Sequence, residues 1–196
     1  MNLEKAIKKL ETRGFGVQYF DNGALAADYI ASQIHNSSVG IGGSKTAEAL
    51  GLYELLEKDN SVYWHWRVPG AETLNAALTA DYYISGANAV SEDGEILNID
   101  GRGNRVAATL YGHKKVFILA AVNKFRPDFA SALDRARNIA AATNVSRFDV
   151  KTPCKIDGKC HDCRAKDRIC NALTVLWGPM MGMETEVIII GEELGY

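Results

Sequence analysis

Four cysteines are the residues whose type and spacing most directly suggest chemistry. They are the only cysteines of the chain and lie within seventeen residues, in "CKIDGKCHDCRAKDRIC", at Cys154, Cys160, Cys163 and Cys170. Thiolates are the ligands of tetrahedral zinc and of iron–sulfur clusters, and the surrounding lysines and arginines would offset the negative charge of such a centre. The spacing matches neither the usual ferredoxin run nor the usual zinc ribbon, so reduced thiols or a disulfide formed in air remain the alternative. We predict a four-cysteine metal site that holds zinc or an iron–sulfur cluster.

A second candidate is the turn "GIGGSKT", which lies between an apolar run and a predicted helix. Glycines let the backbone approach a ligand closely, and the backbone N–H groups, hydroxyls and amine that follow can donate to an anion. The turn is neither a Walker loop nor a dinucleotide fingerprint, because the glycine spacing of both is absent. A turn in which Ser44 only caps the helix is the competing interpretation. We predict that the ligand-binding residues of this turn are Gly42, Gly43, Ser44, Lys45 and Thr46.

Carboxylates gather in the stretch "NAVSEDGEILNIDGRG". Glu92, Asp93 and Asp100 are the candidates for acid–base chemistry, although the sequence does not assign a catalytic role to any one of them. The run "EDGE" also suits an ordinary type I′ turn between strands "NAVS" and "ILNI", which would explain Asp93 without any chemistry. Catalysis is therefore left open.

One amide and two basic residues follow predicted strands or close the loops after them. Asn88 comes directly after "DYYISGA", Arg105 closes "NIDGRGNR", and Lys124 lies in "NKF" after the apolar run "KVFILAAV". Ligands of open α/β sheets bind outside the carboxyl ends of the strands, which is also where the glycine turn would lie. Arginine and lysine pair with phosphate or carboxylate groups. We predict that Asn88, Arg105 and Lys124 contribute to the same ligand site.

The aromatic run "YWHWR" at residues 63–67 has two interpretations. Trp64 and Trp66 would share one face of a strand, where they could stack on a base or a sugar. The same spacing is typical of core or interface packing.

The elements that position these residues alternate regularly along the chain. Six apolar runs predict strands, and helical patterns separate them. Apolar strands without clean alternation indicate burial on both faces, as in a mostly parallel sheet covered by helices. We predict an α/β fold, a Rossmann-like three-layer sandwich, in a single domain over residues 1–196 with a Cys-rich insertion at 151–172 before the last strand. The predicted strands cover 15–20, 38–42, 61–66, 81–87, 115–122 and 185–196, and the predicted helices cover 2–13, 22–35, 44–58, 71–80, 104–112 and 126–143.

Composition excludes several classes of function. The formal net charge of −2 argues against nucleic-acid binding, which favours a basic excess. No apolar run reaches the roughly 18 residues that a membrane span needs. The N-terminal "MNLEKAIKKLETRG" is charged and lacks the apolar core of a secretory signal. We therefore expect a cytoplasmic protein without nucleic-acid or membrane partners.

Four motifs in a fixed order carry a family resemblance. "GIGGSKTAEALGL", "ISGANAVSEDGEILNIDGRGNRVAA", "VFILAAVNKF" and the closing "GEELGY" resemble the LUD family, the lactate-utilisation-type proteins. The likeness runs from about residue 5 to residue 196. That family is similar to the superfamily of ribose-phosphate isomerases, glucosamine-phosphate deaminases and CoA transferases, so the resemblance also implies a Rossmann-like fold.

The resemblance has consequences for individual residues. In the sugar-phosphate isomerase relatives a glycine-rich loop with Ser or Thr holds phosphate, which implies that Gly42, Gly43, Ser44 and Thr46 are anion ligands here. A Gly-Ala-Asp stretch of those relatives supplies a catalytic carboxylate, and its position falls on Asn88 in "SGAN". An amide cannot abstract a proton, so the resemblance implies a binding pocket more strongly than an isomerase reaction.

The expected function is the binding of a small anionic metabolite that is phosphorylated, carboxylated or CoA-like, linked by the resemblance to lactate and 2-hydroxy-acid utilisation. One alternative is a non-catalytic subunit or assembly factor of an iron–sulfur lactate oxidation system, with iron–sulfur oxidoreductase subunits as partners. Another is a metal or redox module centred on the cysteines. The sequence leaves the formation of homo-oligomers open.

Overall fold

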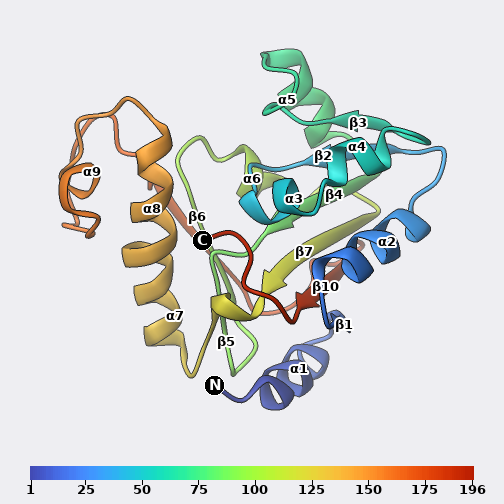
Figure 1. Cartoon of the computed structure of the whole chain (residues 1–196), viewed down its shortest axis with the longest axis horizontal. Coiled ribbons are helices and arrows are strands. Elements are labelled where there is room, and N and C mark those ends of the chain that lie inside the picture. The colour runs from blue at the N-terminus through green and yellow to red at the C-terminus, as the bar shows by residue number, and fades with distance from the viewer.

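The computed structural model describes residues 1–196 and contains two sheets. Every pairing in the larger, six-stranded sheet is parallel, as predicted. Figure 1 shows this sheet between two layers of helices. Its strands stand in the order β1 (Gly16–Phe20), β10 (Glu184–Ile190), β7 (Lys115–Ala121), β4 (Tyr82–Gly86), β2 (Ser38–Ile41) and β3 (Ser61–Tyr63).

The central strands are apolar throughout because both of their faces are buried. On β7, Phe117 and Leu119 join one hydrophobic cluster, while Val116 and Ile118 join the cluster on the opposite face. This even division explains why the strand "KVFILAA" shows no polar alternation. The α/β, Rossmann-like, three-layer prediction is confirmed.

Helices cover the two faces of the large sheet in groups of three. The clusters place α2 (Gly23–Gln33), α3 (Lys45–Ala49) and α4 (Leu52–Leu56) on one face. They place α1 (Leu3–Thr12), α5 (Ala71–Leu78) and α6 (Asn104–Ala108) on the other. Burial of these apolar faces on the sheet is the main term that stabilises such a sandwich.

A four-stranded sheet lies beside the sandwich. Its order is β8 (Phe125–Arg126), β5 (Ala89–Ser91), β6 (Ile96–Asp100) and β9 (Ala172–Leu176). The antiparallel pairing of β5 with β6 matches the hairpin considered for "EDGE". The sequence analysis did not predict β8 and β9.

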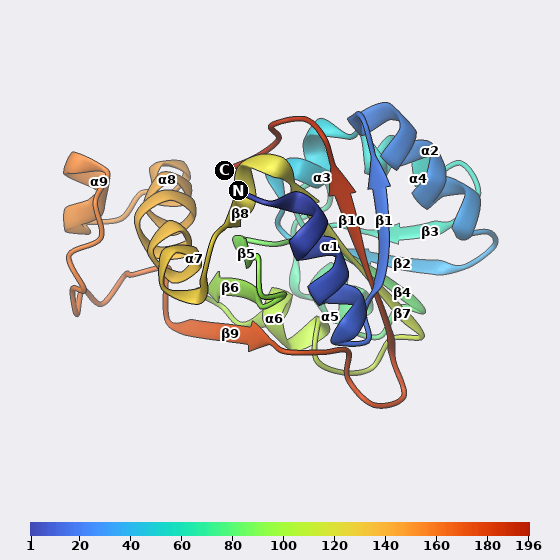
Figure 2. The same cartoon turned by 90° about the horizontal axis from the view of Figure 1, so that it is seen from below.

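A helical column packs on the small sheet and leads to the cysteines. It runs from α7 (Phe129–Arg135) through a π-helical stretch (Ala136–Ala141) and α8 (Ala142–Asn144) to a 3₁₀ turn (Val145–Arg147). After it come α9 (Pro153–Asp157) and an irregular stretch that leads to β9. Figure 2 shows α9 at the end of the molecule farthest from β1 and β10.

Several predicted boundaries are wrong. The helix predicted over 104–112 ends at Ala108, and the strand predicted over 185–196 ends at Ile190. The helix at 44–58 is split into α3 and α4, because Gly51 adopts the left-handed conformation with φ 61°. The strand at 61–66 ends at Tyr63, and the helix predicted from residue 126 begins only at Phe129. There Asp128 and Ser131 form a capping box.

No helix of the structure combines the length and the apolar character that crossing a bilayer requires.

Candidate functional site

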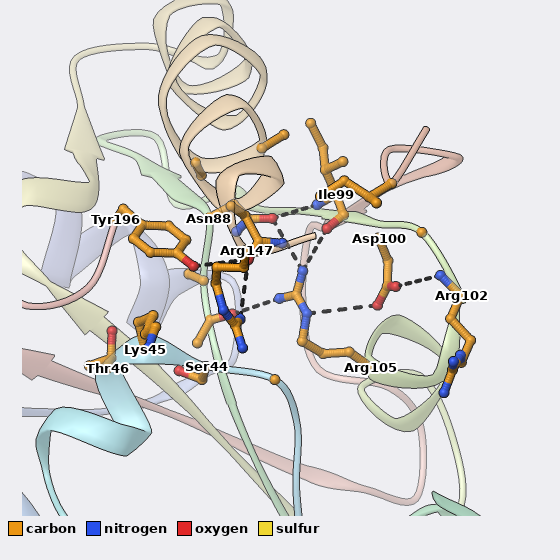
Figure 3. Close-up of a pocket in the computed structure, with 18 of the residues that line it drawn as sticks. Ser44, Lys45, Thr46, Asn88, Ile99, Asp100, Arg102, Arg105, Arg147 and Tyr196 are labelled. Atoms are coloured by element: carbon orange, nitrogen blue, oxygen red, sulfur yellow. Dashed lines mark hydrogen bonds and ion pairs between the residues drawn. The ribbon is translucent and has the colours of Figure 1, made fainter. Parts of the chain in front are cut away.

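A cavity of about 650 Å³, called here the cationic cavity, lies where the large sheet, the small sheet and the helical column meet. Its floor comes from segments that follow the carboxyl ends of β2, β4 and β7, the edge at which ligands bind in open α/β sheets. The β6–α6 loop, the end of the helical column and Tyr196 complete the wall. Figure 3 shows Ser44 and Thr46 on one side of it, Arg105 and Asp100 on the other, and Arg147 between them in this view.

The charge of the cavity wall is strongly unbalanced. Its only acidic side chain is Asp100. The cationic side chains in the wall are Lys45, Arg102, Arg105, Lys124, Arg147 and Arg168. Because clefts lined by one sign of charge concentrate counter-ions, this wall attracts anions.

The glycine turn reaches the cavity through four of its five predicted residues, Gly43 to Thr46. Ser44 is the N-cap of α3, and its side chain accepts a hydrogen bond of 3.1 Å from the N–H of Ala47, so it does cap the helix. Its hydroxyl proton is still free to be donated toward the cavity. Lys45 is already paired with Glu48 and lies 5.5 Å from the ring centre of Trp66.

Gly42 does not line the cavity. A Cβ there would come within 2.8 Å of the Tyr83 hydroxyl and 3.0 Å of the Arg105 side chain. Close packing below the turn therefore requires this glycine. The ligand contact expected of Gly42 is not supported, whereas Gly43 does line the cavity.

Lys124 is the most deeply buried cation of the wall, with 2% of its surface exposed. Its ammonium donates a hydrogen bond of 2.7 Å to the hydroxyl of Thr46, which is itself buried. No carboxylate forms an ion pair with it. Burial, aided by the positive charges of Arg135 and Arg105, lowers the pKa of Lys124 to about 7.

Arg105 is buried in the wall, but its donors are used by the protein. Its two terminal nitrogens bond the carbonyls of Gly86 and Ile99 and the side chains of Asn98 and Asn88. The remaining nitrogen, Nε, lies 3.7 Å from Asp100. Arg105 therefore adds positive charge to the cavity and ties β4 to β6, while few of its N–H groups are left for a ligand.

Asn88 lies in the cavity wall and is held firmly. Its side-chain oxygen accepts from the N–H of Ile99 at 2.7 Å and from Arg105 at 3.3 Å. Its side-chain nitrogen donates to no protein atom. This nitrogen is therefore free to donate to a ligand.

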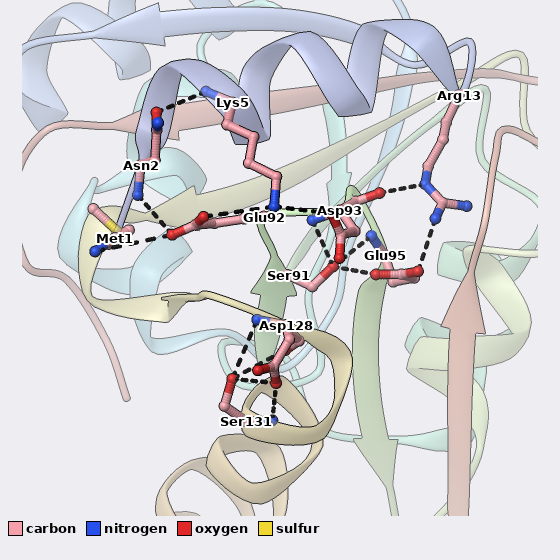
Figure 4. Close-up of polar contacts among 10 residues, drawn as sticks. All are labelled: Met1, Asn2, Lys5, Arg13, Ser91, Glu92, Asp93, Glu95, Asp128 and Ser131. Atoms are coloured by element: carbon pink, nitrogen blue, oxygen red, sulfur yellow. Dashed lines mark hydrogen bonds and ion pairs between the residues drawn. The ribbon is translucent and has the colours of Figure 1, made fainter.

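The three candidate carboxylates have structural roles in this arrangement. Asp100 lines the cavity, but it accepts from the N–H groups of Arg102 at 3.1 Å and Gly103 at 3.0 Å, at the start of α6. Glu92 and Asp93 lie outside the cavity, near α1, where both approach the ammonium of Lys5 (Figure 4). None of the three is placed as a free base facing the cavity.

Residues that the sequence analysis did not assign to the site complete its outer rim. The guanidinium of Arg147 lies 3.7 Å from the ring centre of Trp66, and Trp66 stacks on the buried Trp64 at 5.5 Å. Tyr196 lines the cavity and donates to the side chain of Asn144 at 2.9 Å. Burial lowers the pKa of His65, another wall residue, and the charges of Arg102 and Arg147 act in the same direction.

The four cysteines line a second cavity of about 300 Å³, called here the thiol cavity. All four are free and partly buried. No group of three or more His, Cys, Asp and Glu side chains is arranged so that it could hold a metal ion. Near the thiols, Arg137 donates to the sulfur of Cys160 at 3.6 Å and to Asp162 at 2.9 Å.

The two cavities share part of their walls. Ile99, Ala141, Arg168 and Ile169 line both. Arg168 donates to the carbonyls of Cys163 at 2.7 Å and Cys170 at 2.8 Å, while its buried Nε has no partner. The thiols therefore lie close to the cationic cavity.

Fold and cavity together define an open, mostly parallel α/β protein with a positively charged cavity at the carboxyl edge of its sheet. The model of the LUD domain matches residues 3–190, so the chain belongs to the LUD domain family.

One solved structure agrees with this fold over nearly the whole chain, and two others match only weakly. A DUF162 family protein from Deinococcus radiodurans superposes with a TM-score of 0.56 at 15% identity, over 96% of this chain and 95% of that one. Ribose 5-phosphate isomerase A from Neisseria gonorrhoeae gives a TM-score of 0.36 at 15% identity, over 55% of this chain and 54% of that one. The eIF2B beta subunit from Chaetomium thermophilum gives 0.38 at 22% identity, over 56% and 44%. No curated protein sequence matches the chain significantly.

Proposed function

We propose that the protein binds a small anionic metabolite, phosphorylated, carboxylated or CoA-like, in the cationic cavity. The observation that carries the proposal is Lys124, a buried cation whose only hydrogen-bond partner is the Thr46 hydroxyl. A buried charge without a counter-ion is costly, and an anion in the cavity would offset that cost.

The other wall residues support the same class of ligand. The wall contains six cationic side chains and a single acidic one, Asp100, which already accepts backbone hydrogen bonds. Ser44 and Asn88 add uncharged donors. A volume of about 650 Å³ lies within the usual range of metabolite and cofactor sites.

The size and the rim favour a ligand larger than a free anion. Trp66 stacks on Trp64 and is covered by the Arg147 guanidinium, which is itself a flat surface on which a ring could stack. Through the family we also propose a link to lactate or related 2-hydroxy acids, whose carboxylates carry the required charge.

A thermal-shift screen tests the proposal with sugar phosphates, CoA esters and 2-hydroxy acids. A ligand present at about 100 times its Kd stabilises the folded state by about 2.7 kcal/mol, which raises Tm by several degrees. The matched pair Lys124→Met and Lys8→Met separates site binding from general charge effects, because Lys8 is exposed on α1. Loss of the shift in Lys124→Met alone supports the proposal. No shift with any compound contradicts it and favours the subunit alternative if iron–sulfur proteins co-purify.

A second candidate function rests on the cysteines. We propose that Cys154, Cys160, Cys163 and Cys170 bind zinc or an iron–sulfur cluster, because all four line one cavity. The thiols would have to draw together around the metal, as happens where metal binding and folding are coupled. Metal analysis of anaerobically purified protein tests this proposal. About one zinc ion, or iron with visible absorbance, supports it, and the absence of both contradicts it.

A further inference from the structure

Lys124 is buried, lines the cationic cavity and has no counter-ion, and anion binding alone does not require this combination. The residue follows β7 in a 3₁₀ turn (Val122–Lys124) and lines the cationic cavity. Two glycines lie beside its amine, and a Cβ on Gly86 or Gly195 would come within 3.5 or 3.6 Å of Nζ. No side chain from these two positions competes for the space around the amine.

In the ligand-free protein near pH 7, Lys124 is partly in its neutral form, because it is buried and no anionic group faces it. Arg105 on α6 and Arg135 on α7 are the charged groups that act on it, and both are cations. The Thr46 hydroxyl donates to the carbonyl of Leu194 at 3.3 Å, so it accepts an N–H from Lys124. This contact uses a proton of the amine and leaves the nitrogen lone pair available.

The carboxylates and thiols near the cavity are not placed to act as its nucleophile. Asp100 is occupied by backbone donors, and Glu92 and Asp93 lie outside the cavity. The four cysteines line the thiol cavity instead. Lys124 is thus the buried amine that could react with a compound held by the surrounding cations.

Resting on the proposed anion binding, we propose that Lys124 forms an imine with the carbonyl carbon of a phosphorylated or carboxylated aldehyde or ketone. The lone pair of the neutral amine attacks that carbon, so a C–N bond forms and one nitrogen proton passes to the carbonyl oxygen. The resulting hydroxyl then leaves as water with the second nitrogen proton, and the C=N bond forms. The step consumes no oxidant or reductant.

Pyridoxal 5′-phosphate is a suitable chemical probe, since it joins an aldehyde to a phosphate. The protein is incubated with it near pH 7, reduced with borohydride, and mapped by peptide mass spectrometry. At pH 7 the unprotonated fraction of an amine with a pKa of about 7 exceeds that of an ordinary lysine about a thousandfold. We expect Lys124 to be labelled at least about tenfold faster than the exposed Lys8, and inorganic phosphate to protect it.

Lys124→Arg provides the matched control, because arginine keeps the charge but is no nucleophile. The variant should leave residue 124 unmodified, while the exposed Lys8 is labelled as in the wild type. If phosphate binds to the wild type but Lys124 is not labelled, the imine proposal is overturned and the anion-binding proposal still holds. Neither binding nor labelling overturns both proposals. If phosphate does not slow the labelling of Lys124, the assignment of an anionic substrate is overturned.

Discussion

The cationic cavity and the cysteine segment, residues 151–172, differ in how firmly the protein holds their functional groups. In the cavity, Thr46, Arg105 and Lys124 are buried and hydrogen-bonded to several different elements. In the cysteine segment only Thr152 is buried, and Ile156 is 90% exposed. A ligand therefore meets a pre-organised site in the cavity, whereas a metal would have to organise the segment. The following changes test that difference.

Removal of two thiols should have the largest effect, because metal binding is expected to be all-or-none. Cys160→Ser with Cys163→Ser should abolish metal content and make the cysteine segment protease-sensitive, while Tm of the α/β core stays unchanged. His161→Ala is the matched control and should retain the metal, since His161 pairs with Asp157. An anaerobic wild-type sample without zinc or iron, yet with a protease-resistant segment, contradicts this prediction.

Arg105→Gln should have the next largest effect, because this arginine ties the cavity walls together. Its loss leaves the carbonyls of Gly86 and Ile99 without their partner and Asp100 without its cation. We expect the free energy of unfolding in urea to fall by about 3–5 kcal/mol. Arg102→Gln, on the exposed part of the same loop, should change it by less than about 0.5 kcal/mol. Equal effects of the two variants would contradict the structural role of Arg105.

Lys124→Met should stabilise the ligand-free protein at neutral pH, by up to a few kcal/mol. The folded pKa of about 7 lies below the ordinary lysine value of 10.5, so the unfolded chain binds more protons between these two values. The free energy of unfolding of the wild type therefore rises with pH over this window. The destabilisation caused by the buried charged amine is fully present below about pH 7. Urea unfolding across pH should show that the advantage of the variant shrinks toward pH 10. If the free energies of unfolding of the wild type and the variant change with pH in parallel, the burial of a charged amine is contradicted.

Arg147→Ala should have the smallest effect, because Arg147 is exposed and contacts the rim through Trp66. We expect ligand affinity to fall about two- to fivefold, with no change in Tm. Arg164→Ala, in the exposed part of the cysteine segment, should leave affinity unchanged. If Arg147→Ala lowers ligand affinity by more than about tenfold, the ligand is bound mainly by the rim and not by Lys124.

The fold was largely predictable, because short local sequence patterns indicate its strands and helices. All six strands of the large sheet were predicted from apolar runs such as "KVFILAAV", and their burial on both faces follows from the same runs. β8 and β9 were not predicted. β8 has only two residues, and both strands exist through pairing with distant partners: Val90 pairs with Phe125, and Leu97 with Val175.

The candidate site was predictable where it follows strand ends. Ser44, Asn88 and Lys124 come soon after β2, β4 and β7, and the rule for open α/β sheets places such residues at one edge. Arg147 and Tyr196 could not be predicted, since their positions depend on how the helical column and the last residues fold back over that edge. Sequence spacing also could not show that Gly42 serves packing.

Calorimetric titration of inorganic pyrophosphate into the wild type and Lys124→Met, at low and at high salt, tests the central claim most directly. The cationic cavity predicts saturable binding to one site, weaker at high salt and at least about tenfold weaker in the variant. Lys8→Met should match the wild type. Absence of binding by the wild type, or equal affinity in the wild type and Lys124→Met, would contradict the claim that the cationic cavity binds an anion through its buried lysine.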